Sequence, residues 1–153
     1  MGVPVSFSST RNAPNFASLV YPRRSPAVEA TAAAVTYSVV QVLGGLILRD
    51  PNGAARADLL PTAAALIAAW QGAESAPVQA GVTTLAYGSS FEFEIRNTAD
   101  AAETITVTTN TGLTLSGTMT IAQSNQKRFI AVVTNHEKGS EAVTIYSCGT
   151  VVF

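Results

Sequence analysis

Few side chains in this sequence are of the types that carry out chemistry. There is one histidine, His136, and one cysteine, Cys148. A Ser-His-Asp or Cys-His arrangement would have to use His136, which lies in the polar stretch TNHEKGSE. Because a catalytic base needs a pocket and an orienting partner, we predict a solvated loop histidine. One histidine and one cysteine are also too few for a structural zinc site.

Two carboxylates stand close together in the stretch SFEFEIR. Glu92 and Glu94 are two residues apart and therefore share one face of a predicted strand. Paired carboxylates act as acid and base in glycoside hydrolases. Arg96 lies on the same face, however, and a solvated polar face is the simpler interpretation.

The remaining polar clusters do not match known binding patterns. The segment DPNGAARAD offers Asp50, Asn52 and Asp58, but its proline and alanines disfavour a metal loop. Neither glycine-rich phosphate-binding pattern occurs. Lys127-Arg128 is an isolated basic pair, and the net charge is -1, so a nucleic-acid partner is not indicated. We predict no catalytic, cofactor or metal site, and a protein that is not an enzyme.

The composition indicates a chain with much apolar surface to bury. Hydrophobic residues make up 47% of the sequence and charged residues 12%, against a usual charged fraction of about a quarter. We interpret this as a hint of burial against other chains. Cys148 sits in an apolar strand pattern and is predicted to be a small buried hydrophobe. No run of 18 apolar residues occurs, so no transmembrane segment is predicted.

Residues 1–28 are predicted to form an extended N-terminal arm. Prolines recur in it, and it contains arginines but no acidic residue. It is either a solvated arm or one that docks on an acidic partner surface. Gly2, in MGVPVS, fits the N-myristoylation pattern; the alternative is a common residue after the initiator Met. The arginines are Arg11, Arg23 and Arg24, and the prolines are Pro4, Pro14, Pro22 and Pro26.

Residues 29–81 are predicted to hold strands and one helix. The β-branched run 35–43 predicts a strand, Gly44-Gly45 a bend, and Leu46 to Arg49 a further strand. The sequence DPNG at 50–53 predicts a turn, because proline fixes φ and glycine accepts positive φ.

A short alanine-rich helix is predicted over residues 62–71, with Pro61 in its first turn and Gly72 as its stop. Its core face is Ala63, Leu66, Ile67 and Trp70, at helical spacing. The opposite face carries alanine and no charge, as if another backbone approached it. We take a subunit interface as one hypothesis and a helix wholly inside its own domain as the other. The hypothetical interface residues are Ala65, Leu66, Ala69 and Trp70.

Residues 82–153 hold roughly six predicted strands, which indicate an antiparallel sandwich or a small barrel, and we favour a jelly-roll-like antiparallel β-sandwich. The alternation of SFEFEIR and ITVTT carries this prediction, and the stretches KRFIAVVT and AVTIYSCGTVVF close the series of strands. The C-terminal residues 151–153 are too apolar to be left unpaired. The fold class is therefore mainly β, and residues 29–153 form one structural unit.

A family resemblance adds to this description. The segments GGLILRDPNGAARADLLPTAAALIAAW, GSSFEFEIRNTADAAETITVTTNTGLTLSGTMTIAQSNQKRFIAVVTN and EAVTIYSCGT cover roughly residues 44–150. They resemble a module of small capsid-associated virion proteins of large eukaryotic DNA viruses, in particular the Marseillevirus-like group. The arm at residues 1–28 lies outside the resemblance.

The resemblance implies a non-enzymatic structural protein of the virion capsid, made in the host cytoplasm. It implies a homotrimer that decorates or cements the capsid and contacts other capsid proteins. The alternative is a surface module of the virion that recognises a glycan or receptor through aromatic side chains. The available aromatics are Tyr37, Trp70, Tyr87, Phe129 and Tyr146.

Overall fold

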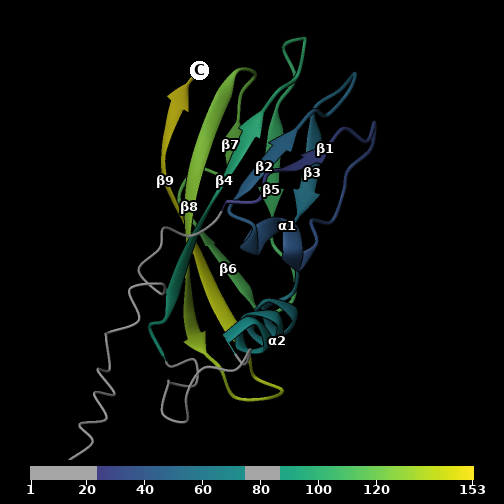
Figure 1. Ribbon diagram of the computed structural model, residues 1–153. Coiled ribbons are helices and arrows are strands. Elements are labelled where there is room, and N and C mark those ends of the chain that lie inside the picture. The colour runs from purple at the N-terminus through teal and green to yellow at the C-terminus, as the bar shows by residue number, and fades with distance from the viewer. Residues whose placement is uncertain (1–23, 75–86) are drawn as a thin grey trace, which may run out of the picture.

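The chain is described by a computed structural model, which places residues 24–74 and 87–153 (Figure 1). In this part of the chain, strands dominate and two helices accompany them. The six-stranded sheet has the order β1-β2-β4-β8-β9-β6, and a three-stranded sheet has the order β3-β5-β7. The strands are β1 (Ala27–Glu29), β2 (Leu46–Arg49), β3 (Arg56–Leu59), β4 (Ser90–Asn97), β5 (Ile105–Thr108), β6 (Leu113–Ser116), β7 (Thr120–Ile121), β8 (Asn125–Asn135) and β9 (Ala142–Val152).

Both sheets are mixed, which corrects the prediction of an antiparallel sandwich. The long central strands β4, β8 and β9 pair antiparallel. Parallel pairs join β1 to β2, β2 to β4, β6 to β9 and, in the small sheet, β3 to β5. The alternation of a strand fixes which face it buries but not the direction of its neighbour. Strand direction follows from how the chain crosses between the sheets.

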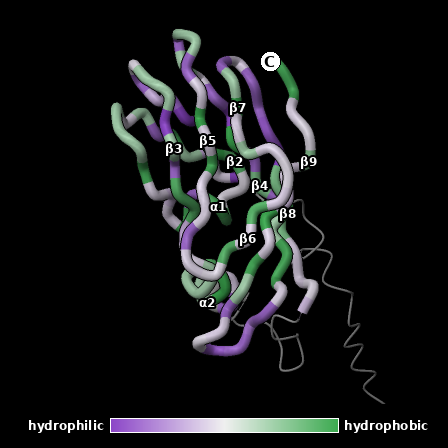
Figure 2. The backbone as a smooth tube through the Cα atoms, turned by 180° about the vertical axis from the view of Figure 1, so that it is seen from behind, coloured by the Kyte–Doolittle hydropathy of each residue, from purple (hydrophilic) through white to green (hydrophobic). Residues whose placement is uncertain are grey.

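The core lies between the two sheets and is built from alternate residues of their strands. Phe93 of β4 and Phe129 of β8 are fully buried and stack with ring centroids 5.1 Å apart. Ile105 and Val107 of β5 face them from the small sheet as part of the same buried cluster. Figure 2 shows hydrophobic stretches in the strands of the large sheet and a hydrophilic loop at the end where α2 lies. Burial alternates along β4 and β8 and in β9 as far as Ile145, so the predicted period-2 burial is confirmed for these segments.

The run 35–43 is not a strand, contrary to the prediction. It contains the short helix α1 (Val39–Leu43), which begins after Ser38. Ser38 Oγ accepts a hydrogen bond from Gln41 N, and Gln41 Oε1 accepts one from Ser38 N. This reciprocal capping box satisfies donors that a helix start leaves free. It outweighs the β preference of the valines.

The alanine-rich helix α2 (Ala63–Glu74) is confirmed, and so is its core face. Ala63, Leu66 and Ile67 are buried, and the half-buried Trp70 packs edge-on against Phe91 with centroids 5.1 Å apart. The predicted stop at Gly72 is wrong, because the helix continues to Glu74. In Figure 1, α2 lies at the end of the molecule opposite the C-terminus.

Two strand pairings join segments that lie far apart in the sequence. No strand is predicted between the turn at 50–53 and the helix, but β3 forms there by pairing with β5. The pairing of the C-terminus is confirmed, since Asn125 of β8 lies opposite Val152 and Phe153 N donates to Ser124 O at 3.1 Å.

Candidate functional site

The most strongly connected polar group in the interior is an ion pair between the two sheets. Arg49 ends β2 of the large sheet, and Asp58 lies on β3 of the small one. Arg49 Nε donates to Asp58 Oδ2 at 2.8 Å, and both side chains are completely buried. The pair therefore ties one sheet to the other through the core.

All five N–H donors of Arg49 have acceptors. Besides Nε, one Nη2 hydrogen bond goes to Asp58 Oδ1 at 3.3 Å. The other three reach main-chain carbonyls, at Thr31 (2.9 Å), Ala33 (2.7 Å) and Asp50 (2.5 Å). A guanidinium with every donor occupied has none left with which to bind an anionic ligand. Arg49 therefore holds the loop between β1 and α1 in place through these hydrogen bonds and has no donor left for a substrate.

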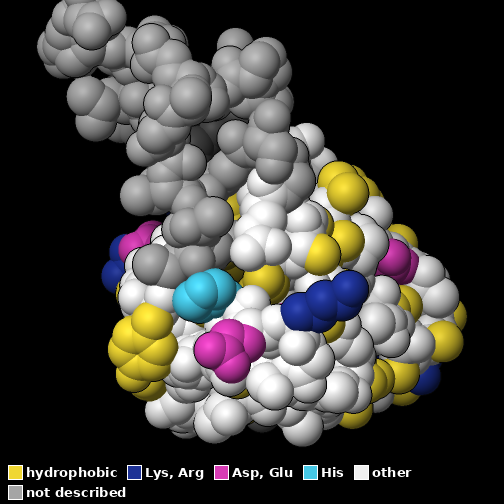
Figure 3. All heavy atoms as spheres, turned by 90° about the horizontal axis from the view of Figure 1, so that it is seen from below, with side chains coloured by type: hydrophobic (Ala, Val, Ile, Leu, Met, Phe, Trp, Pro, Cys, Tyr) yellow, Lys and Arg dark blue, Asp and Glu magenta, His cyan; other side chains and the backbone are white. Residues whose placement is uncertain are grey.

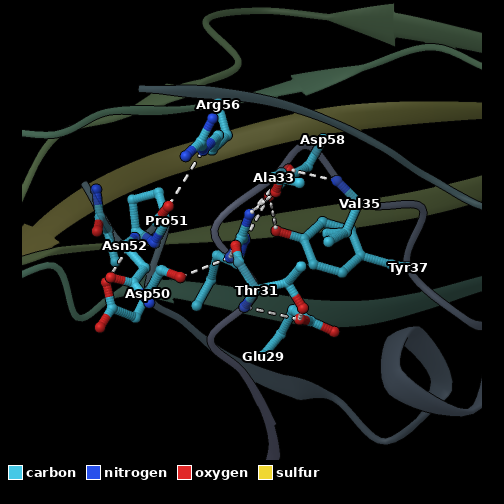
Figure 4. A network of polar contacts seen from close by, with 12 residues as sticks. Glu29, Thr31, Ala33, Val35, Tyr37, Asp50, Pro51, Asn52, Arg56 and Asp58 are labelled. Atoms are coloured by element: carbon cyan, nitrogen blue, oxygen red, sulfur yellow. Dashed lines mark hydrogen bonds and ion pairs between the residues drawn. The ribbon is translucent and has the colours of Figure 1, made fainter. Parts of the chain in front are cut away.

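Asp58 is saturated in the same way. Tyr37 Oη donates to Asp58 Oδ2 at 2.8 Å, and Val35 N donates to Oδ1 at 3.0 Å. Figure 4 shows Tyr37 and Val35 converging on Asp58. Burial, and then the charge of Asp58, raise the pKa of Tyr37 far above its ordinary value. The phenol therefore remains a proton donor to this carboxylate, with no tendency to ionise as a base.

Two further buried polar residues of the large sheet also reach the small one. Lys127 Nζ on β8 donates to the carbonyls of Thr118 (2.7 Å) and Thr120 (2.8 Å), and burial lowers the pKa of Lys127. Asn97 Nδ2, at the end of β4, donates to the carbonyls of Glu103 (2.9 Å) and Ile121 (3.1 Å). With the Arg49–Asp58 pair, they form three polar ties between the sheets.

The residues screened for chemistry from the sequence do not come together. His136 is exposed in the loop between β8 and β9. Glu92 and Glu94 lie on the outward face of β4, where Glu92 is 3.8 Å from Arg128 and Glu94 pairs with Arg24. Within residues 24–74 and 87–153, no group of three His, Cys, Asp or Glu side chains is close enough to hold a metal ion.

Cys148 is not buried, contrary to the prediction. The register of β8 against β9 shifts between Lys127 and Phe129, as at a β-bulge. The strict alternation of inward and outward side chains is therefore interrupted at this point of β9. The half-exposed thiol lines a shallow hollow of about 260 Å³ on the outward face of the large sheet. The other residues of the hollow are Glu94, Gln126, Arg128, Gly149, Thr150 and Val151, so it lacks the aromatic wall typical of a glycan site.

A chain of polar contacts runs across the same outward face. Arg24 pairs with Glu94 at 2.5 Å, and Gln126 Nε2 donates to Glu94. Arg96 Nε donates to Gln126 Oε1 at 2.9 Å, and its guanidinium lies 4.1 Å from the centre of the Phe153 ring. These side chains hold one another and fix the C-terminal residue to β4.

The four residues of the hypothetical helix interface divide into two groups. Leu66 belongs to the core, and Trp70 packs against its edge. Ala65 is exposed, and Ala69 is half-buried. Figure 3, which looks at the molecule from the end where α2 lies, shows a surface dominated by uncharged and hydrophobic side chains with few charges. The alanine face of α2 is thus open on the described part of the protomer.

Three residues named in the predicted N-terminal arm, Gly2, Arg11 and Arg23, lie outside the residues that the structure describes. Neither helix of the described part of the chain has the length and apolar character needed to cross a bilayer.

Comparison with protein families, with curated proteins and with solved structures returned no match for this chain.

Sequence reasoning missed the Arg49–Asp58 centre, although a signal was present. Arg49 ends an otherwise apolar strand, GGLILR, and Asp58 precedes two leucines. A charge placed in such a run must find a partner if the strand is buried. The partner could not be chosen from the sequence, because several carboxylates were available and the pairing depends on which strands face each other.

Proposed function

We propose that this chain is a non-enzymatic structural protein that assembles with copies of itself and with capsid proteins in a virion. The observation that carries the proposal is the use of the buried polar groups. Of the buried polar side chains in the described residues, Arg49, Asp58, Asn97 and Lys127 fasten one sheet to the other, and Glu103 accepts a hydrogen bond from Gly53 N. The buried polar groups therefore hold the two sheets together.

The outer surface supports assembly as the role. The exposed face of α2 carries small uncharged side chains, which let a second backbone approach closely and leave no charge to be desolvated. Large hydrophobic side chains are also exposed at the C-terminal end of β9, where Val151 is 66% and Val152 75% exposed. Apolar surface buried between subunits contributes about 25 cal/mol per Å².

The finer features of the proposal rest on the resemblance to capsid-associated proteins of the Marseillevirus-like group. These are the homotrimer, the virion location, the jelly-roll-like connectivity of the sandwich, and a decorating or cementing position on the capsid. Quantitative mass spectrometry of purified virus particles tests the location, with the chain expected at the abundance of a structural protein. Its absence from the particles would contradict the proposal.

A second candidate is a glycan- or receptor-binding module of the virion. It is favoured by two exposed aromatic side chains, Tyr87 at 76% and Tyr146 at 43%, because exposed rings are what sugars stack on. A glycan array probed with the full chain distinguishes the candidates. Saturable binding that is lost in Tyr146→Ser would support recognition, whereas an array without hits would leave assembly as the function.

A further inference from the structure

The outward face of the large sheet combines a charged row, in which Arg96 and Arg128 accompany Glu92 and Glu94, with an apolar row. Glu92 and Glu94 point outward from β4. Glu92 lies opposite Ile130 of β8, and Ile130 lies opposite Tyr146 of β9. Ile130 and Tyr146, with the half-buried Val132 two positions along β8, form a strip that we call the β8–β9 strip. Among the described elements no helix or strand crosses this strip.

The first described residues of the chain are fixed beside this face. Arg24 Nη1 lies 2.5 Å from Glu94 Oε2. Ser25 N donates to Gly44 O at 2.8 Å, so the main chain is held at the next residue as well. The chain therefore passes from the outward face of β4 to the edge strand β1, and the residues before Arg24 join the described part beside Glu94.

The apolar part of residues 1–23 matches the apolar strip of this surface. The charges of the face are already matched, since Glu94 pairs with Arg24 and Glu92 lies 3.8 Å from Arg128, so the fit rests on apolar side chains. Just before Arg23 and Arg24 stands the apolar run Leu19-Val20-Tyr21. This run lies three to five positions from Arg24, a reach of roughly 10–17 Å for extended chain. Neighbouring strands are about 4.8 Å apart, so the β8–β9 strip begins within that reach.

We propose that the outward face of β4, β8 and β9 is the docking surface for the N-terminal segment of the same chain. The Arg24–Glu94 pair anchors the segment, and Leu19, Val20 and Tyr21 cover the β8–β9 strip. The occupant is the segment of the same protomer because its anchor is already seated on this face. The inference stands on these contacts and does not depend on the virion role.

Hydrogen exchange of the full-length chain tests the docking. In the unmodified protein the amides of residues 19–21 exchange at least tenfold more slowly than in an unstructured peptide. Glu94→Gln, which removes the anchor charge, and Tyr146→Ser, which removes the apolar contact, each restore fast exchange there. Glu137→Gln in the exposed loop and Val40→Ser on α1 are the matched controls and leave the protection unchanged. Exchange of residues 19–21 at the unprotected rate in the unmodified protein would overturn the proposal.

The concentration dependence of the protection distinguishes a segment of the same chain from that of a second copy. Docking within one protomer is unimolecular, so the slow exchange of residues 19–21 is expected to stay unchanged when the protein is diluted. Protection that disappears on dilution would assign the surface to a second copy and would overturn the proposal.

Discussion

At the scale of single residues, the stability of the fold is sensitive to the buried ion pair of Arg49 and Asp58. Both charges are fully buried, and their hydrogen bonds are satisfied by each other, by Tyr37 and by main-chain groups. Such a pair adds little relative to a well-packed apolar pair, but losing one partner leaves an uncompensated charge in the core. The effect of a substitution therefore depends on which partner remains.

Asp58→Asn is expected to lower the free energy of unfolding by about 3–5 kcal/mol, because Arg49 would remain buried without its counter-charge. Urea denaturation monitored by circular dichroism measures the change. Glu92→Gln is the matched control, since it makes the same chemical change in an exposed pair 3.8 Å from Arg128. That control should change stability by less than about 1 kcal/mol. Equal effects in the two variants would contradict a buried ionic tie.

Because the pKa of the Tyr37 phenol is raised, the free energy of unfolding is expected to depend on pH. An unfolded tyrosine ionises near pH 10, whereas in the folded chain the pKa of Tyr37 is raised by burial. Above pH 10 the folded state consequently binds more protons than the unfolded state, and stability falls as pH rises. Tyr37→Phe should be less stable by about 1–3 kcal/mol at pH 8, and the difference should shrink above pH 10.

Urea denaturation of both proteins from pH 8 to pH 11 measures that difference. Burial lowers the pKa of Lys127, which gives an effect of opposite sign. This effect is present in both proteins and cancels in the comparison. A difference between the two proteins that stays constant across the range would show that Tyr37 does not retain its proton in the folded state.

At the scale of elements, the turn between β5 and β6 positions α2. Gly112 has φ +77, and a Cβ built there would lie 2.6 Å from Glu141 O and 2.7 Å from the Cβ of Ala63. Ala63 N also donates to Thr111 O at 3.0 Å. The first residue of the helix therefore sits directly on this turn, and only a residue without a side chain leaves room for it.

Gly112→Ala should lower the free energy of unfolding by clearly more than about 1 kcal/mol, because strain at positive φ is added to a collision with main chain and helix. Gly139→Ala is the matched control, since its φ of +86 is similar but nothing lies within 4 Å of the added Cβ. Chemical denaturation of both variants separates strain from collision. Equal losses in the two would mean that α2 can move away from the turn without cost.

At the scale of the whole molecule, α2 packs its core face against the shared core and leaves its uncharged face exposed in the described part of the chain. The core face of α2 is occupied by its own protomer, whereas Ala65 is exposed and Ala69 half-buried. A monomer usually places charges on such a face. The assembly proposed for this protein is where this surface would be covered.

The full-length protein is expected to sediment as a trimer at micromolar concentration. Ala65→Glu should convert it to monomers with the circular dichroism spectrum unchanged, because a carboxylate would be desolvated at the interface while the core face stays intact. Ala101→Glu, in the exposed loop after β4, is the matched control and should leave the trimer intact. A monomeric unmodified protein would contradict the oligomeric proposal.

The sequence by itself determined the elements whose signal is local. The period-2 alternation of SFEFEIR and ITVTT predicted β4 and β5, and helical spacing predicted the buried face of α2. Burial of one face is encoded in residue type and spacing, so it can be read without knowing the partner. Where two local signals compete, as the capping box and the valines do in α1, the pattern alone was misleading.

Only the tertiary structure decided which strands are neighbours and therefore what the polar residues do. Parallel pairing of β2 with β4 and of β3 with β5 brings Arg49 and Asp58 face to face across the core. The register change in β9 turns Cys148 outward into the hollow beside Glu94. These outcomes depend on contacts between residues far apart in the chain, whose energies are settled only when the two sheets close on each other. In the folded chain, Arg49 and Asp58 therefore form an ion pair that joins the two sheets.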